Sequence, residues 1–257
     1  MRVRAAVIGV VAIVALLGFA WFCRINFATL DRTGFVDCEC VGPDGRPVRY
    51  VTYVPPEYRP DRDWPLIVFL HGTGERGTDG RTHLRVGLAP SINKVRREGK
   101  TAFDFVALFP QSRSGQWEPG SPDEARLEAA LADARSRYAL DARRLYLTGH
   151  SSGGTGAWCL AAATPGRWAA VAPLCGTVDP SGAAALASVP CWYFHGTDDT
   201  PESVVQADAL IRAVRAAGGV PRYSLLPSLG HGIWPEVYGD PAFYNWLRVQ
   251  QSSAAAH

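Results

Sequence analysis

A serine flanked by glycines follows directly on a short apolar segment, a pattern used for nucleophilic catalysis. The segment Leu145-Tyr146-Leu147 leads into Gly149-His150-Ser151-Ser152-Gly153-Gly154, which matches G-x-S-x-G, and a helical pattern follows at residues 155–163. Such a turn from strand to helix is so tight that a Cβ on either side of the serine would clash, and it lifts the serine Oγ above the helix. We therefore predict that Ser151 is a nucleophile. A chance glycine-rich turn is the alternative.

A serine hydroxyl is a weak nucleophile at neutral pH, so this prediction requires a general base. In this setting the partners follow in the order Ser, Asp or Glu, His. Three histidines precede the serine and one lies in the terminal tail, which excludes His71, His83, His150 and His257. His195 is excluded because the best-suited acids come after it. The base is therefore predicted to be His231, in the glycine-flanked segment Leu229-Gly230-His231-Gly232, with a surface histidine as the alternative.

The acid that orients this base is expected on the loop after the apolar segment Trp192-Tyr193-Phe194. Asp198 and Asp199 both stand on that loop, and their spacing does not choose between them. With either aspartate the chain has the components of a Ser-His-Asp triad, in which serine attacks an acyl carbon and histidine moves the proton.

Acyl transfer also needs hydrogen-bond donors for the negative charge that develops on the substrate oxygen. One expected donor is the backbone N–H of Ser152, the residue after the nucleophile, and the other comes from a loop after an early strand. Leu70-His71-Gly72-Thr73-Gly74 is such a loop, and Thr73 is its predicted donor. This chemistry implies no metal and no organic cofactor.

Two tryptophans flank the expected pocket and are candidate substrate-binding residues. Trp117 and Trp234 could stack on an aromatic acyl group or on a sugar, and packing in the core is the equal alternative for each. Glu75 and Arg76 follow the predicted oxyanion loop. For them an ion pair that stiffens the loop is favoured over a contact with an acidic or sugar-linked substrate.

The elements that must position these residues follow an alternating pattern. Two strands, at residues 35–41 and 47–54, are predicted around the turn formers Gly42-Pro43-Asp44-Gly45. Helices begin at the capping box Ser121-Pro122-Asp123-Glu124 and at Thr200-Pro201-Glu202. Other short apolar segments occur at residues 65–70, 105–109, 145–147, 169–172, 192–194 and 223–226. This alternation predicts an α/β fold, a mostly parallel sheet with helices on both faces.

The combined motifs resemble those of the α/β-hydrolases, in particular bacterial esterases and predicted peptidases related to phospholipase/carboxylesterases, polyhydroxybutyrate depolymerases and feruloyl esterases. The matching segments are residues 70–77, 109–111, 149–154, 172–176 and 195–199, and the resemblance spans roughly residues 45–248. It implies the α/β-hydrolase fold and its chemistry but no particular substrate. In the family, the catalytic aspartate stands four places after the histidine of the loop that corresponds to residues 195–199 here. The resemblance therefore implies Asp199. Thr200-Pro201 departs from the apolar-Pro pair usual in the family.

The amino-terminal segment has the pattern of a membrane anchor or a signal peptide. Residues 5–23 carry no charge and follow Arg2 and Arg4, and a helix over them would be about 28 Å long at ~1.5 Å per residue. We favour an anchor over cleavage, with the catalytic domain outside the cytoplasm. The expected organisation is an anchor or signal peptide at 1–23, a linker at 24–33, the hydrolase domain at 34–250 and a flexible tail at 251–257. Six cysteines permit disulfides there, but no pairing can be deduced.

Composition sets the remaining limits. With 47% hydrophobic and 19% charged residues, the 257-residue chain is neither disordered nor a coiled coil, and its net charge of +2 does not favour nucleic acid as a partner. We expect a serine hydrolase that cleaves small-molecule or polymer-linked carboxylic esters through an acyl-enzyme. A serine peptidase or an acyltransferase would use the same site, and a non-catalytic binding domain on the same scaffold is the alternative from another class.

Overall fold

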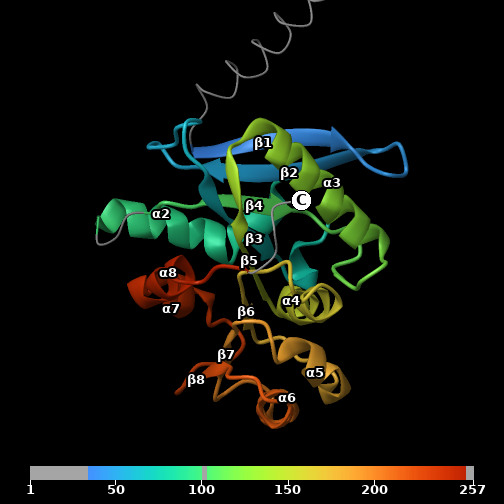
Figure 1. Ribbon diagram of the computed structural model, residues 1–257, viewed down its shortest axis with the longest axis vertical. Helices are drawn as coiled ribbons and strands as arrows, with labels where there is room; N and C mark the ends of the chain where they lie inside the picture. The colour runs from blue at the N-terminus through green and yellow to red at the C-terminus, as the bar shows by residue number, and fades with distance from the viewer. Residues whose placement is uncertain (1–33, 100–102, 253–257) are drawn as a thin grey trace, which may run out of the picture.

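The computed structural model describes residues 34–99 and 103–252 (Figure 1). The predicted anchor or signal peptide at 1–23, the linker at 24–33 and most of the predicted tail lie outside the described residues. Within the described ranges, no helix is both long enough and apolar enough to cross a membrane.

Eight strands form one sheet in the order β1-β2-β4-β3-β5-β6-β7-β8. The β1–β2 and β2–β4 pairs are antiparallel, and the other neighbours are parallel. The strands are β1 (Gly34–Val41), β2 (Pro47–Val54), β3 (Trp64–Leu70), β4 (Val106–Pro110), β5 (Leu140–His150), β6 (Ala170–Leu174), β7 (Trp192–Gly196) and β8 (Arg222–Leu226). The predicted α/β fold with a mostly parallel sheet is confirmed.

Helices cover both faces of this sheet, as Figure 1 shows. One face is covered by α3 (Pro122–Arg137), α4 (Ser152–Ala163), α5 (Ala183–Leu186) and α6 (Pro201–Ala216). The other face is covered by α2 (Leu88–Glu98), α7 (Trp234–Gly239) and α8 (Pro241–Arg248). Three short 3₁₀ turns complete the described elements: η1 (Thr73–Glu75), η2 (Thr82–Arg85) and η3 (Pro180–Gly182).

The core forms two layers because side chains along each strand alternate between the faces. In β3, Val68 and Leu70 pack toward the α3–α6 side, whereas Ile67 and Phe69 pack toward α2, α7 and α8. Every residue of β3 is buried. A continuous apolar segment is what a strand covered on both faces requires.

Capping residues in the sequence determine where two long helices begin. Ser121 Oγ accepts a hydrogen bond from the Glu124 N–H at 3.1 Å at the start of α3. Thr200 caps α6 in the same way, through the Ser203 N–H at 3.3 Å. These side chains satisfy amide donors that have no partner inside the helix. Both caps were predicted from the sequence.

The strand order places the loop after β3 beside the loop after β5, at the carboxyl ends of the parallel strands. β3 lies between β4 and β5, and Leu70 of β3 is paired with Gly149 of β5. The chain leaves β3 toward β4 on one side and returns to β5 on the other. Such a reversal opens a crevice at the carboxyl ends of parallel strands, which is where α/β proteins bind ligands.

Candidate active site

Ser151 occupies a strained turn between β5 and α4. Its φ is 58° and its ψ is −123°, a conformation that costs free energy for a residue with a side chain. The Ser151 N–H donates to the Leu174 carbonyl at 2.9 Å, which holds the turn against β6. Glycine is required around it, because a Cβ on Gly149 would lie 2.4 Å from the Gly153 carbonyl oxygen. The turn therefore has the geometry predicted for a nucleophile.

The loop after β3 lies directly beside this turn. A Cβ on Gly72 would come within 3.4 Å of the Ser151 Cβ. Thr73 Oγ1 donates a hydrogen bond to Ser152 Oγ at 3.0 Å. The two residues predicted to supply oxyanion donors, Thr73 and Ser152, are therefore in contact with each other beside Ser151.

His71 holds the backbone of this loop. The Ser112 N–H donates to His71 Nε2 at 2.9 Å, so the proton of the neutral ring is on Nδ1, which donates to the Gly72 carbonyl at 2.7 Å. Trp117 Nε1 donates to the His71 carbonyl at 3.0 Å. Burial lowers the pKa of His71, which favours the neutral ring that these contacts need.

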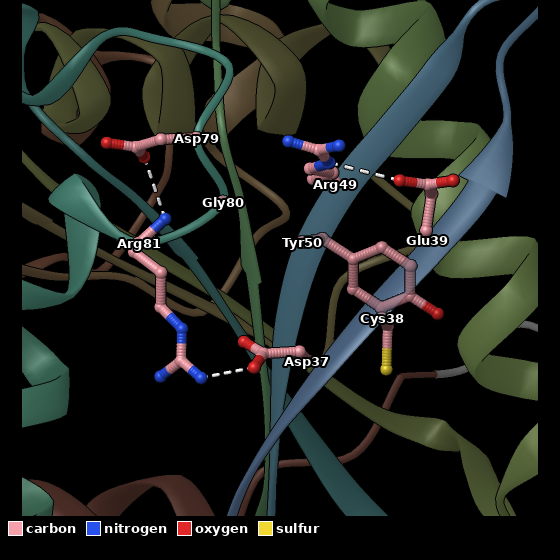
Figure 2. A pocket seen from close by; sticks show the side chains of 8 residues that line it. All are labelled: Asp37, Cys38, Glu39, Arg49, Tyr50, Asp79, Gly80 and Arg81. Atoms are coloured by element: carbon pink, nitrogen blue, oxygen red, sulfur yellow. Dashed lines mark hydrogen bonds and ion pairs between the residues drawn. The ribbon is translucent and has the colours of Figure 1, made fainter.

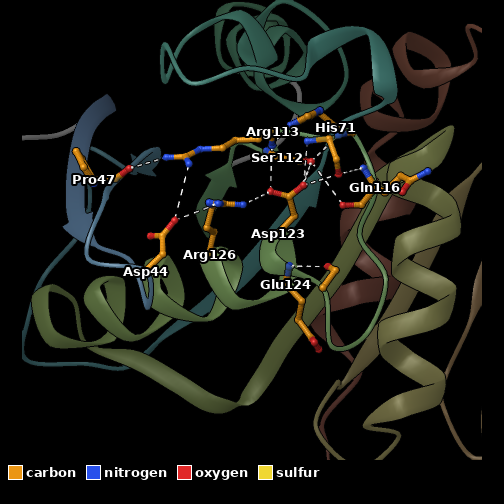
Figure 3. Close-up of polar contacts among 12 residues, drawn as sticks. Asp44, Pro47, His71, Ser112, Arg113, Gln116, Asp123, Glu124 and Arg126 are labelled. Atoms are coloured by element: carbon orange, nitrogen blue, oxygen red, sulfur yellow. Dashed lines mark hydrogen bonds and ion pairs between the residues drawn. The ribbon is translucent and has the colours of Figure 1, made fainter.

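Asp123 in turn holds the segment that contacts His71, as Figure 3 shows. It accepts hydrogen bonds from Ser112 Oγ at 2.7 Å, from Ser114 Oγ at 2.6 Å and from the backbone N–H groups of Arg113 and Ser114. Arg126 pairs with it at 2.8 Å. Burial opposes its charge, but the donated hydrogen bonds outweigh burial and lower the pKa to about 2. The sequence pattern around Asp123 indicated only a helix cap.

His231 and Asp199 are in contact, and Asp198 is not part of that contact. His231 Nδ1 lies 2.9 Å from Asp199 Oδ2. The Asp199 side chain is 6% exposed, whereas that of His231 is 49% exposed. Asp198 Oδ1 instead accepts from Thr197 Oγ1 at 2.8 Å. Burial opposes the Asp199 charge, yet hydrogen bonds from His231 and from the Thr200 N–H lower its pKa overall.

The loop that carries His231 is hydrogen-bonded to the residue that precedes Ser151 in the turn between β5 and α4. His150 Nε2 donates to the His231 carbonyl at 2.7 Å, and the two ring centroids are 4.8 Å apart. Among the described residues, no hydrogen bond joins Ser151 Oγ to His231. Catalytic hydrogen bonds are often long before substrate binds, so the missing bond does not exclude His231 as the base.

The two candidate tryptophans occupy different environments. Trp117 is 2% exposed and packs against Gly156 and the His71 ring, so its burial favours packing in the core, one of the two alternatives, over substrate contact. Trp234 is half-buried at the start of α7, with its ring centroid 4.9 Å from that of His150. Of the two tryptophans, Trp234 is the one that is partly exposed beside the candidate site.

The segment after the oxyanion loop also differs from expectation. Arg76 donates to the Thr73 carbonyl at 2.9 Å, and among the described contacts it forms no ion pair with Glu75. Burial raises the pKa of Glu75. The loop is thus stiffened by a hydrogen bond to its backbone.

A cavity of about 310 Å³ lies between this region and the first two strands, as Figure 2 shows. Its charged walls are largely paired, Arg49 with Glu39 at 3.0 Å and Arg81 with Asp37. The side chain of Gln111 links this cavity to the predicted oxyanion loop through its hydrogen bonds.

Side chains able to bind a metal ion also meet at the candidate site. One ligand atom each from His150, Cys175 and His231 lie within 4.8 Å of one another, as do those of Cys175, His195 and Asp199. Several of these groups already contact one another, as His231 does Asp199. The described cysteines, Cys38, Cys40, Cys159, Cys175 and Cys191, carry free thiols.

Comparisons with known proteins agree with this geometry. A family model described as "Putative esterase" matches residues 124–245. The bifunctional acetylxylan esterase/xylanase of Neocallimastix patriciarum is 24% identical over 169 residues, which are 63% of this chain and 23% of that protein. The chain thus spans about a quarter of that relative's length.

Solved structures extend the likeness over most of the domain. A thermostable esterase superposes with a TM-score of 0.71 and 29% identity, over 84% of this chain and 63% of that one. The feruloyl esterase module of Clostridium thermocellum, complexed with sinapinate, superposes with a TM-score of 0.69 and 15% identity, over 87% and 90% of the two chains, a likeness of fold. Its fold, the family match over residues 124–245 and these relatives together support an α/β-hydrolase esterase family for the chain.

Proposed function

We propose that the protein is a serine hydrolase that cleaves carboxylic esters through an acyl-enzyme. The observation that carries the proposal is the hydrogen bond between His231 Nδ1 and Asp199, beside the strained turn that presents Ser151. The esterase family match supports the class of reaction.

We assign a role to each residue on the basis of these contacts. Because the Nδ1–H of His231 is donated to Asp199, the free lone pair is on Nε2, which takes the proton of Ser151 as its oxygen attacks the acyl carbon. The oxyanion is bound by the backbone N–H groups of Thr73 and Ser152. His231 then gives the proton to the leaving alcohol, and water repeats the sequence on the acyl-enzyme.

The substrate class proposed is a small-molecule or polymer-linked ester. A relative is named for acetylxylan, and a feruloyl esterase module of the same fold was solved with sinapinate. Trp234, half-buried beside His150, is the residue proposed to contact the acyl group. We further propose, from the uncharged segment at residues 5–23, that the domain acts outside the cytoplasm.

The test is a panel of acetyl, aliphatic and hydroxycinnamoyl esters, run beside peptide amides and alcohol acceptors. The proposal predicts ester hydrolysis that Ser151→Ala abolishes and that a fluorophosphonate blocks. Cleavage of peptide amides in preference to esters would identify a peptidase. Acyl transfer to an added alcohol in preference to water would identify an acyltransferase.

A further inference from the structure

A second histidine contacts Asp199 beside His231. His195, near the carboxyl end of β7, is 0% exposed, and its Nε2 lies 3.3 Å from Asp199 Oδ2. His231 Nδ1 approaches that same oxygen at 2.9 Å. The other oxygen, Oδ1, accepts from the Thr200 N–H at 2.8 Å. The carboxylate is therefore held on both oxygens, and one of them lies against two imidazole rings.

The proton on His195 can be assigned from its neighbours. Ser203 Oγ donates to the Thr200 carbonyl at 3.0 Å, so it accepts from His195 Nε2, 2.9 Å away. That places the ring proton on Nε2. His195 Nδ1 is then an acceptor, and the Tyr193 hydroxyl donates to it at 2.9 Å.

This tautomer turns an N–H toward the carboxylate. The Nε2–H of His195 donates to Ser203 Oγ, and the same Nε2 lies 3.3 Å from Asp199 Oδ2, so the protonated nitrogen of the ring is the one beside the buried charge. Burial lowers the pKa of His195, which keeps the ring neutral. A neutral ring attracts the carboxylate through its N–H and carries no net charge of its own.

We propose that His195 is a positioning residue that holds Asp199 against His231 Nδ1, with Tyr193 fixing its tautomer. The inference rests on the proposed function, because it acts only through the triad. In the sequence His195 was rejected as the base. In the structure it contacts the acid, as do His231 and the Thr200 N–H.

The first test compares two replacements of His195. His195→Phe fills the space but supplies no donor. We expect kcat to fall about tenfold to a hundredfold, the loss typical when a group that orients a functional side chain is removed, with KM within about twofold. His195→Gln places an amide N–H near the position of Nε2 and should restore most of kcat. A purely structural role would give no rescue beyond the recovery of Tm.

The second test is a double-mutant cycle. If His195 acts through Asp199, then His195→Phe should lower kcat in the wild type and leave it unchanged in an Asp199→Ala background. If it contributes only general stability, the two losses in kcat will multiply. That outcome would overturn the proposal.

A matched pair of tyrosines provides the control. Tyr193 and Tyr50 are both buried, and each donates its hydroxyl to another side chain. Tyr50 donates to Asp133 and stands on β2, toward the opposite end of the strand order from β7, which carries Tyr193. Tyr193→Phe should lower kcat in the same direction as His195→Phe, whereas Tyr50→Phe should change only Tm. Equal kcat values for the two variants would contradict the role given to Tyr193.

Failure of the inference and failure of the proposed function are distinguishable. If the wild type hydrolyses esters and depends on Ser151 and Asp199, yet folded His195→Phe keeps wild-type kcat, only the positioning role is overturned. If Ser151→Ala keeps the wild-type activity, the proposed function is overturned and the role of His195 falls with it.

Discussion

The two adjacent aspartates after β7 differ in burial and in partners. The carboxylate of Asp199 is buried against His231, whereas Asp198 is exposed and bonded to Thr197. Asp199→Asn should lower kcat by about 10⁴, because the imidazole loses the partner that fixes its tautomer, and Asp198→Asn should have a mild effect. Steady-state kinetics on one ester would check this. A dead Asp198 variant beside a fully active Asp199 variant would contradict the assignment.

The two tryptophans should also separate in experiment. Trp117→Ala empties a core position and should cost about 3–5 kcal/mol of stability, lowering activity on every ester alike. Trp234→Ala should instead lower kcat/KM for hydroxycinnamoyl esters more than for acetyl esters. Thermal melts run beside both assays would show which effect applies. Unchanged acyl selectivity in Trp234→Ala would remove its proposed role in substrate contact.

At the scale of elements, the start of α3 braces the oxyanion loop through Asp123 and the Ser112 segment (Figure 3). In Asp123→Asn an amide replaces the carboxylate that accepts several hydrogen bonds. We expect the free energy of unfolding to fall by about 3 kcal/mol, and kcat to fall because the Thr73 amide moves. Denaturant unfolding and kinetics would measure both.

Asp141 provides the matched control for this variant. It also pairs with an arginine three residues on, Arg144, but it lies at the amino end of β5, away from the candidate site. Asp141→Asn should leave kcat unchanged. If both variants lower kcat equally, bracing of the loop is not the cause.

The sequence predicted the elements that have strong local signals. The strands are short apolar segments bounded by turn formers, and α3 and α6 begin with capping residues that bond as expected. The helices α2, α7 and α8 were missed. A signal for α8 was present, since Asp240 precedes Pro241 and its side chain accepts the Ala242 N–H at 2.8 Å. The burial of Trp117 and the bracing by Asp123 depend on contacts between distant segments, which local patterns do not contain.

At the scale of the whole molecule, buried histidines should make stability depend on pH. Burial lowers the pKa values of His83 and His150 to about 4 each. Below about pH 6.5 the unfolded chain takes up protons at these residues and the folded chain does not, so stability falls until pH reaches about 4. The loss is about 3 kcal/mol for each histidine. Stability should therefore be greatest above pH 6.5.

Denaturant unfolding at intervals from pH 7 to pH 4 would measure this slope. His83→Gln removes one of the two groups and should make the slope shallower, although the variant itself is less stable. A free energy of unfolding that does not change between pH 7 and pH 4 would contradict the buried, neutral state of these histidines.

The proposed function requires that Ser151 is the nucleophile of an ester hydrolase. It is tested most directly by incubating the folded protein with a fluorophosphonate and locating the adduct by peptide mass spectrometry. We expect one adduct, on Ser151, which forms in parallel with loss of esterase activity, is absent from Ser151→Ala and forms much more slowly in His231→Ala. An adduct on another residue, or full esterase activity in Ser151→Ala, would contradict it.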